Sequence, residues 1–253
     1  MSILQYLLIG LAAFFGGAVN ALAGGGTLIT FPILIAVGIP PVSANVTNTV
    51  ALVPGYFGAT LAQLKDIKGQ ENRSRILFPV SALGGLVGGL LLINTNEDAF
   101  RTLIPYLILL ATLLLAAGEP LHKWIVRRSG QTDNLRSPET WAFLPIFLGA
   151  IYGGYFGAGL GVITLAVLGL LMNDTITRLN ALKQGISLAV NLAGAILFFF
   201  SGKVHWLAAL VMAVFALAGG SLGGRLAGKV KPAVLRRIVV VIGLIVSLIY
   251  FVR

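Results

Sequence analysis

The chain has 253 residues, of which 57% are hydrophobic and only 10% are charged, and its mean hydropathy is +0.95. This composition excludes an ordinary soluble domain and is typical of a chain that crosses a membrane several times. The formal charge of +10 comes from basic residues in short loops beside apolar runs, so orientation in the membrane explains it better than nucleic-acid binding, and no nucleic-acid partner is expected.

The first half begins with an apolar helix expected over residues 3–23, which the consecutive glycines Gly24–Gly26 interrupt. A shorter apolar piece over 27–37 follows and ends at a pair of prolines. At about 1.5 Å per residue, this piece is too short to cross a bilayer core of about 30 Å. We therefore expect a re-entrant hairpin with the glycines at its tip, or a long limb beside a short one. Three further helices are expected over 44–64, 76–93 and 100–117.

After a polar linker over 119–140, the second half repeats this plan. A helix over 141–156 leads into a second glycine-rich break and a short limb that ends near Met172, followed by helices over 175–200, 206–226 and 234–252. The predicted fold class is an all-α polytopic membrane protein. It has two repeats, residues 1–118 and 141–253, each formed by a glycine-broken hairpin and three transmembrane helices.

An internal repeat connects the two halves. Shifted by 135 residues, Asn45 falls on Asn180, and the Gly-Gly-x-x-Gly-Gly patch at 84–89 falls on the patch at 219–224. When the offset is reduced by one residue, Gly25 falls on Gly159. Similar composition alone does not keep such an offset, so we expect two homologous halves, a plan typical of transporters. The two patches are predicted to be surfaces where helices pack closely.

The positions of the basic residues predict how the halves are oriented. A returning hairpin plus three spans is an odd number of crossings, so the second half is expected to be inverted relative to the first. The cytoplasmic segments would then be 65–75, 119–140, 173–178 and 225–237, which hold 14 of the 18 Lys and Arg residues. The positive-inside rule favours this arrangement over a parallel repeat, and both termini are then expected to be periplasmic.

Several kinds of chemistry are excluded by what the apolar segments lack. All eight acidic residues lie in loops or at the ends of spans, which argues against a carboxylate proton relay, an acidic channel ring and intramembrane aspartyl proteolysis. The absence of Cys excludes thiol catalysis and thiolate metal sites. We therefore expect neither an enzyme nor a metal or other cofactor, and the chain has no nucleotide-binding loop.

Lys183 is the charged residue expected deepest in the membrane, about 12 Å along its helix from Thr175. Because no carboxylate is nearby to neutralise it, its natural partner is an anion. Its own face carries further polar side chains, at Asn180, Gln184 and Ser187, and the matching face of the first half carries Asn45, Asn48 and Thr49. The alternative is that Lys183 extends to the cytoplasmic surface.

The two glycine-rich breaks are expected to complete this anion site. Helix N-termini at Thr27 and Gly161 present free N–H groups, and glycine lets an oxyanion approach the backbone closely. The alternative is that the glycines only allow helices to pack closely. The candidate substrate-binding residues are Asn20, Gly24, Gly25, Gly26, Thr27, Asn45, Asn48, Thr49, Gly159, Gly161, Asn180, Lys183 and Gln184.

At these residues the chain resembles the TauE/SafE family of sulfite and organosulfur exporters. The resemblance lies in the segment from Gly17 to Pro32, in Ala44–Thr49 after a proline turn, and in the second copy around Gly157–Thr164 and Asn180–Gln184. It implies transport of sulfur-containing anions, such as sulfite or sulfoacetate, across the bacterial inner membrane. The second copy departs from the first at Leu160 and Lys183, so the site is expected to be asymmetric.

The function expected is that of a secondary transporter of small sulfur-containing oxyanions that works by alternating access. Its expected partners are the anion and the lipid bilayer, with a homo-oligomer possible. Two other classes stay open at this point: an anion channel, and a membrane subunit that only scaffolds a partner. Repeated polar faces inside the membrane argue against a scaffold, and saturation of the flux would distinguish a transporter from a channel.

Overall fold

The computed structural model describes residues 1–128, 142–227, 229 and 233–252. These residues form helices and contain no strand. The helices are α1 (Ile3–Leu22), α2 (Thr27–Ala36), α3 (Pro41–Ala62), α4 (Leu64–Ile67), α5 (Glu71–Asn94), α6 (Glu97–Arg128), α7 (Phe143–Tyr155), α8 (Leu160–Leu171), α9 (Ile176–Phe199), α10 (Trp206–Leu226) and α11 (Ala233–Val252). The all-α fold and both glycine-broken hairpins, α1–α2 and α7–α8, are confirmed.

Six of these helices are long and apolar enough to cross a membrane: α1, α5, α9, α10, α11 and the part of α6 up to Gly118. The helix α3 is 22 residues long but falls outside this set because Asn45, Thr47, Asn48 and Thr49 lower its hydropathy. These four polar side chains are all buried. The helices that cover α3 are chiefly α9 and α10, so its polar turns lie inside the bundle, whereas Phe57 and Leu61 farther along are exposed.

Several helix ends differ from the sequence-based expectation. The helix α3 begins at Pro41, three residues early, because proline fits the first turn of a helix. The expected loop over 65–75 contains α4 and the first turn of α5. The helix α6 continues to Arg128, into the expected linker, because Glu, Lys and Arg are good helix formers. The rest of that linker lies outside the described residues.

The two halves interlock by pairing their helices crosswise. In one set α1 packs on α10 and α10 on α3, and in the other α7 packs on α5 and α5 on α9. The helices α3 and α9 also contact each other, as do α6 and α11. Each contact therefore has a counterpart in which first-half and second-half helices exchange places. The halves consequently do not form two separate bundles.

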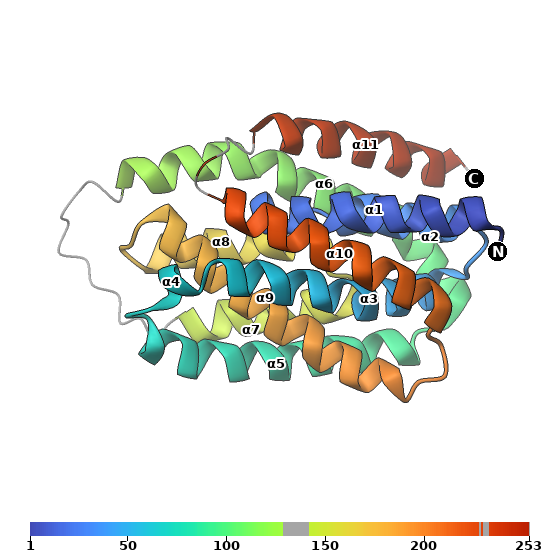
Figure 1. Ribbon diagram of the computed structural model, residues 1–253, viewed down its shortest axis with the longest axis horizontal. Coiled ribbons are helices and arrows are strands. Elements are labelled where there is room, and N and C mark those ends of the chain that lie inside the picture. Colours follow the sequence, from blue (N-terminus) through green and yellow to red (C-terminus); the bar gives the residue numbers. More distant parts are fainter. Residues whose placement is uncertain (129–141, 228, 230–232, 253) are drawn as a thin grey trace.

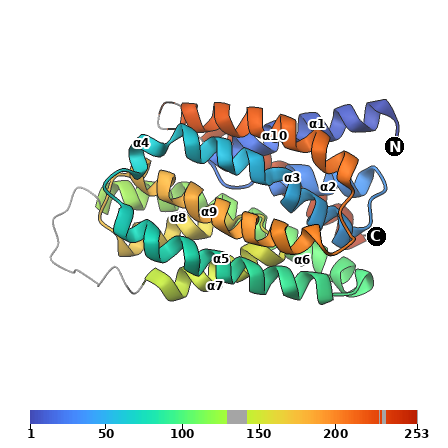
Figure 2. The same cartoon turned by 60° about the horizontal axis from the view of Figure 1, so that its bottom comes forward.

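The figures show the directions of the helices. The helix α6 runs toward the end of the molecule where α4 lies, and its repeat counterpart α11 runs the opposite way (Figure 1). Both chain termini lie at the other end, which the rotated view also shows (Figure 2). The inverted relation of the halves remains a prediction that these directions support. The end that contains α4, the start of α9 and the start of α11 is called the basic end below.

The glycine patches of α5 and α10 lie where the crosswise pairs touch. A Cβ added at Gly219 would overlap the carbonyl of Phe14 in α1, and one at Gly88 would overlap the carbonyl of Ile151 in α7. Backbone this close leaves no room for any side chain. The prediction that these patches are close-packing surfaces is confirmed.

We expect Gly219→Ala to lower the free energy of unfolding by about 1–3 kcal/mol, since its methyl group would meet backbone that cannot rotate away. The matched control is Gly194→Ala, where the new Cβ would lie 3.6 Å from Phe198 and from Thr49, an ordinary contact. This control should leave stability unchanged or raise it by about 0.5–1 kcal/mol. Thermal unfolding in detergent measures both, and equal melting temperatures would contradict this packing role.

Candidate functional site

The tips of the two broken hairpins touch each other in the interior of the protein. A Cβ built on Gly24 would lie 2.9 Å from the Cα of Gly161, and one built on Gly161 would lie 2.8 Å from the Cα of Gly24. Gly24 also has a φ of +84°, which favours glycine. The contact therefore requires glycine on both sides, and it joins the two halves at their interrupted segments.

Lys183 of α9 lies directly beside this tip contact. Its side chain is 2% exposed, and its Nζ donates a hydrogen bond to the carbonyl of Asn20, 3.2 Å away. Its Cδ would lie 3.5 Å from a Cβ on Gly161. The ammonium group is thus held at the tips, which contradicts the alternative that Lys183 extends to the surface.

The neighbours of Lys183 on α9 bind the same end of α1. Gln184 donates from Nε2 to the carbonyl of Ala21 at 2.8 Å. Asn20 accepts from the backbone N–H of Gly26 through its Oδ1 at 2.7 Å, which ties the first hairpin across its own break. Asn20 therefore stabilises the tip through its side chain and accepts the hydrogen bond from Lys183 through its backbone carbonyl.

The first half makes a matching but uncharged contact. Asn45 of α3 donates from Nδ2 to the carbonyl of Tyr155 at 2.8 Å, and its counterpart Asn180 contacts the carbonyl of Ala21 at 3.5 Å. In both halves, this amide reaches the hairpin of the other half. The position that corresponds to Lys183 holds Asn48, which is 2% exposed. This difference supports the expected asymmetry, in which the second half contributes the cation.

The remaining candidates are distributed around this centre. Thr27 is 4% exposed, and its Oγ1 would lie 4.0 Å from a Cβ on Gly157 of the second hairpin. Gly25 and Gly159 pack against α6, near Leu115 and Ala111. Thr49 donates to the carbonyl of Asn45 in its own helix. The structure thus gathers a group around Lys183 that consists of Asn20, Gly24, Gly26, Gly161, Asn180 and Gln184.

The group around Lys183 is positive and incompletely satisfied. Among the described residues, Lys183 has no carboxylate partner, and it donates a hydrogen bond to a neutral carbonyl. The buried donor Asn20 Nδ2 also finds no hydrogen-bond partner in the part of the chain that the structure describes, and neither does Gln184 Oε1, an acceptor that would not face an anion. An unpaired buried polar group costs about 1–3 kcal/mol, and an unpaired buried charge costs more. The arrangement can therefore bind a small anion.

Two residues near this group were missed by the sequence reasoning. Gln63 is 2% exposed, and its Oε1 accepts from Asn180 Nδ2 at 2.7 Å. Arg236, expected in a cytoplasmic loop, is 5% exposed in α11, and its charge acts on Lys183. The buried residues of α11 are Arg236, Val239, Gly243 and Ser247. This helical spacing is the signal that would have placed Arg236 on the buried face.

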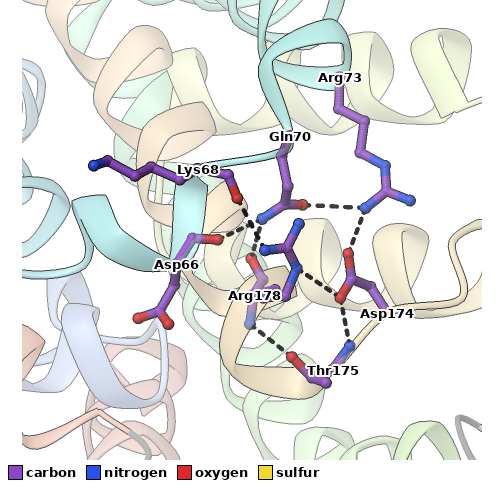
Figure 3. Close-up of polar contacts among 7 residues, drawn as sticks. All are labelled: Asp66, Lys68, Gln70, Arg73, Asp174, Thr175 and Arg178. Atoms are coloured by element: carbon purple, nitrogen blue, oxygen red, sulfur yellow. Dashed lines mark hydrogen bonds and ion pairs between the residues drawn. The ribbon is translucent and has the colours of Figure 1, made fainter.

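A separate polar cluster lies at the basic end (Figure 3). Asp174, just before α9, accepts from Arg73 Nη1 at 2.6 Å and from Arg178 Nε at 2.9 Å. Partial burial by itself would raise the pKa of the Asp174 carboxyl. The hydrogen bonds from Arg73, Arg178 and the backbone N–H of Thr175 outweigh that effect and hold the pKa below its ordinary value of 3.8.

The lowered pKa predicts how acid affects stability. A carboxyl whose pKa is depressed in the folded state adds stability that is fully present above its unfolded pKa and is lost as the pH falls through its folded pKa. Asp174→Asn should therefore lose less stability than the wild type between about pH 5 and about pH 3. Melting temperatures of both proteins across this range measure the difference. Parallel curves would show that Asp174 is not stabilised as a carboxylate.

The comparisons with known proteins agree with this architecture. The family model described as "Sulfite exporter TauE/SafE" matches residues 9–250. A probable membrane transporter protein of Haemophilus influenzae is 29% identical over 239 residues, which cover 92% of this chain and 89% of that protein. The probable membrane transporter protein YfcA of Escherichia coli K12 is 25% identical over 237 residues, 93% of this chain and 85% of that protein.

The probable membrane transporter protein YunE of Bacillus subtilis is 26% identical over an alignment of 269 positions, gaps included, which covers 96% of each chain. These similarities run through both halves and not only through the glycine motifs. The helices long enough to span a membrane make the protein a multi-pass membrane protein. The chain therefore belongs to the TauE/SafE family of membrane transporters.

Proposed function

We propose that the protein is a secondary transporter that moves small sulfur-containing oxyanions, such as sulfite or a sulfonate, across the bacterial inner membrane. The observation that carries the proposal is the buried Lys183 ammonium, which has no carboxylate partner among the described residues and lies where the two hairpin tips meet. A charge in this position is costly unless an ion of opposite sign binds beside it.

The residues around Lys183 fit a small oxyanion. Lys183 would supply the positive charge, and the unpaired Asn20 Nδ2 would donate to one oxygen. Gly161, in the first turn of α8, lies beside Lys183, and helix N-termini favour anions. Gln184 and Asn180 hold the end of α1 in place through the carbonyl of Ala21. Donors that approach from α1, α8 and α9 suit the divergent oxygens of a sulfite or sulfonate group.

Alternating access in this protein would be a rearrangement of the interlocked helices around the tip contact. The two proposed halves, 1–118 and 141–253, are interlocked crosswise, and the anion site lies between them. The positive-inside rule places the basic end in the cytoplasm and both termini in the periplasm. Such a rearrangement would expose the site first on one side of the membrane and then on the other.

Anion flux into proteoliposomes and anion-dependent thermal stabilisation of the purified protein together test this proposal. We expect saturable flux of sulfite or sulfoacetate, with weaker responses to acetate and other carboxylates. Flux that rises linearly without saturation would instead indicate a channel. The absence of both flux and stabilisation with every anion would indicate a scaffold, and preference for carboxylates would contradict the sulfur-anion assignment.

A further inference from the structure

A line of polar residues leads from Lys183 toward the basic end. One turn before Lys183 on α9, Asn180 donates to the buried Gln63 at the end of α3, and this contact bridges the two halves. Arg178 lies two residues nearer the end, on another face of α9, and its carbonyl accepts from Gln70. Polar side chains inside a membrane protein usually line the path of a solute. This line is therefore the natural route between the Lys183 site and the basic end.

The outer end of this line is a cluster of four side chains, Gln70, Arg73, Asp174 and Arg178, called the clasp below (Figure 3). Arg73 binds Asp174, while Gln70 Nε2 donates to the carbonyl of Arg178 at 3.1 Å. In return, Arg178 Nη1 donates to the carbonyl of Lys68 at 2.9 Å. Each of these three contacts joins residues 68–73, at the start of α5 in the first half, to residues 174–178, at the start of α9 in the second.

The clasp is open to solvent, unlike the glycine contacts between the halves. It borders a surface cleft of about 270 Å³, which Gly69, Glu71 and Asn72 also line. The side chains of Arg73, Asp174 and Arg178 are 16%, 13% and 32% exposed. The glycine patches of α5 and α10, in contrast, pack backbone against backbone. Water can therefore reach the clasp and solvate its groups as they part, which keeps the cost of opening small.

The connectivity of the clasp also preserves part of its bonding when it opens. Arg178 and Asp174 belong to the same half and are four residues apart, so their 2.9 Å ion pair can persist. Arg73 keeps a 3.2 Å hydrogen bond to Gln70 on its own side. The Arg73–Asp174 ion pair and the two hydrogen bonds to backbone carbonyls join the two sides and must break.

We propose that the clasp is the gate that closes the route between the Lys183 site and the basic end, and that it must open for an anion to pass there. This inference rests on the proposed transport function. It assigns Arg73 and Asp174 as the pair that separates, and Gln63 with Asn180 as the contact that closes the route one level deeper. The basic side chains at the mouth would also raise the local concentration of anions.

The natural absence of Cys allows a direct test with introduced thiols. The double variant Arg73→Cys/Asp174→Cys, reconstituted in proteoliposomes, is treated with a short cross-linker that a reductant can cleave. We expect cross-linking to reduce sulfite flux by about tenfold or more, and reduction to restore it, because a tethered gate cannot open. Each single variant, treated in the same way, is the control. Undiminished flux in the cross-linked double variant would overturn the gate.

Anion-dependent thermal stabilisation of the same double variant separates failure of the gate from failure of the transport proposal. Sulfite should still stabilise the cross-linked protein to within about twofold of the untreated protein, because the Lys183 site lies away from the clasp. If sulfite stabilises the protein neither before nor after cross-linking, this result contradicts the proposed anion site at Lys183 and not the gate. A labelling experiment then tests, without any anion, whether the clasp closes the route.

The labelling experiment uses Ser187→Cys as a reporter beyond the gate. Ser187 is 2% exposed and lies one turn past Lys183 on the same face of α9. A membrane-impermeant maleimide applied from the basic end should label it about fivefold faster when Arg73→Ala is added, since the open state becomes more populated. Arg75→Ala removes an exposed charge from the same helix and should leave the rate unchanged. Equal rates in both backgrounds would overturn the proposal.

Discussion

Replacing Lys183 by methionine is expected to weaken sulfite binding by about 100-fold or more and to abolish saturable flux, because it removes the charge that the anion neutralises. The same substitution should leave the melting temperature in the absence of anion unchanged or higher. Methionine is unbranched and fills a similar space, and the change removes a buried charge that has no carboxylate partner among the described residues. Loss of binding without loss of stability is the distinguishing result.

The matched control is Lys203→Met. Lys203 also donates from Nζ to a backbone carbonyl, that of Ile93 at 3.0 Å, but it lies between α9 and α10 and is only partly buried. This variant should bind and transport anions like the wild type. Equilibrium binding in detergent and flux in proteoliposomes measure both variants. Wild-type flux in Lys183→Met would show that the anion does not need this ammonium group, and the proposed site would then be wrong.

Much of the fold could be predicted from the sequence because its strongest signals are local. Apolar length defines a span, and Gly24–Gly26 break a helix wherever they stand. The ends of helices were predicted less well, since charged residues such as those around Glu71 and Arg128 do not terminate a helix when water is available. The crosswise pairing of α1 with α10 and of α7 with α5 was not predicted, because glycine patches indicate close packing without identifying the partner.

Lys183 and its neighbours on α9 were predicted as the candidate site, but Gln63, which lies beside them, was not. Lys183 was identified because a lysine in an apolar helix is unusual on its own, and its polar neighbours follow from helical spacing. Gln63 was missed because a glutamine at a helix end is ordinarily solvated, and only the fold brings it to Asn180. Gly25 and Gly159 lie in the glycine motifs but pack against α6. A motif gives the residues of a tip, whereas tertiary packing decides which way each one faces.

Gly161→Ala is expected to reduce anion flux by about tenfold or more, because the tips of the two hairpins can no longer meet. The new Cβ would lie 2.8 Å from the Cα of Gly24, a backbone atom that cannot rotate away, so one tip must shift. Such a shift also disturbs the hydrogen bond between Lys183 and the carbonyl of Asn20. Overpacking of this kind should further lower the free energy of unfolding by about 1–3 kcal/mol.

Comparison with Gly194→Ala separates the tip contact from a general effect of adding a methyl group. Gly194 is also a buried glycine in a membrane helix, but its new Cβ would meet only side-chain atoms at 3.6 Å, so flux and binding should match the wild type. Gly24→Ala should be at least as harmful as Gly161→Ala, because it adds an unfavourable φ of +84° to the same collision. If Gly161→Ala carries sulfite at the wild-type rate, close approach of the two tips cannot be a step of the transport cycle. The anion would then have to cross on a path that leaves the hairpins apart.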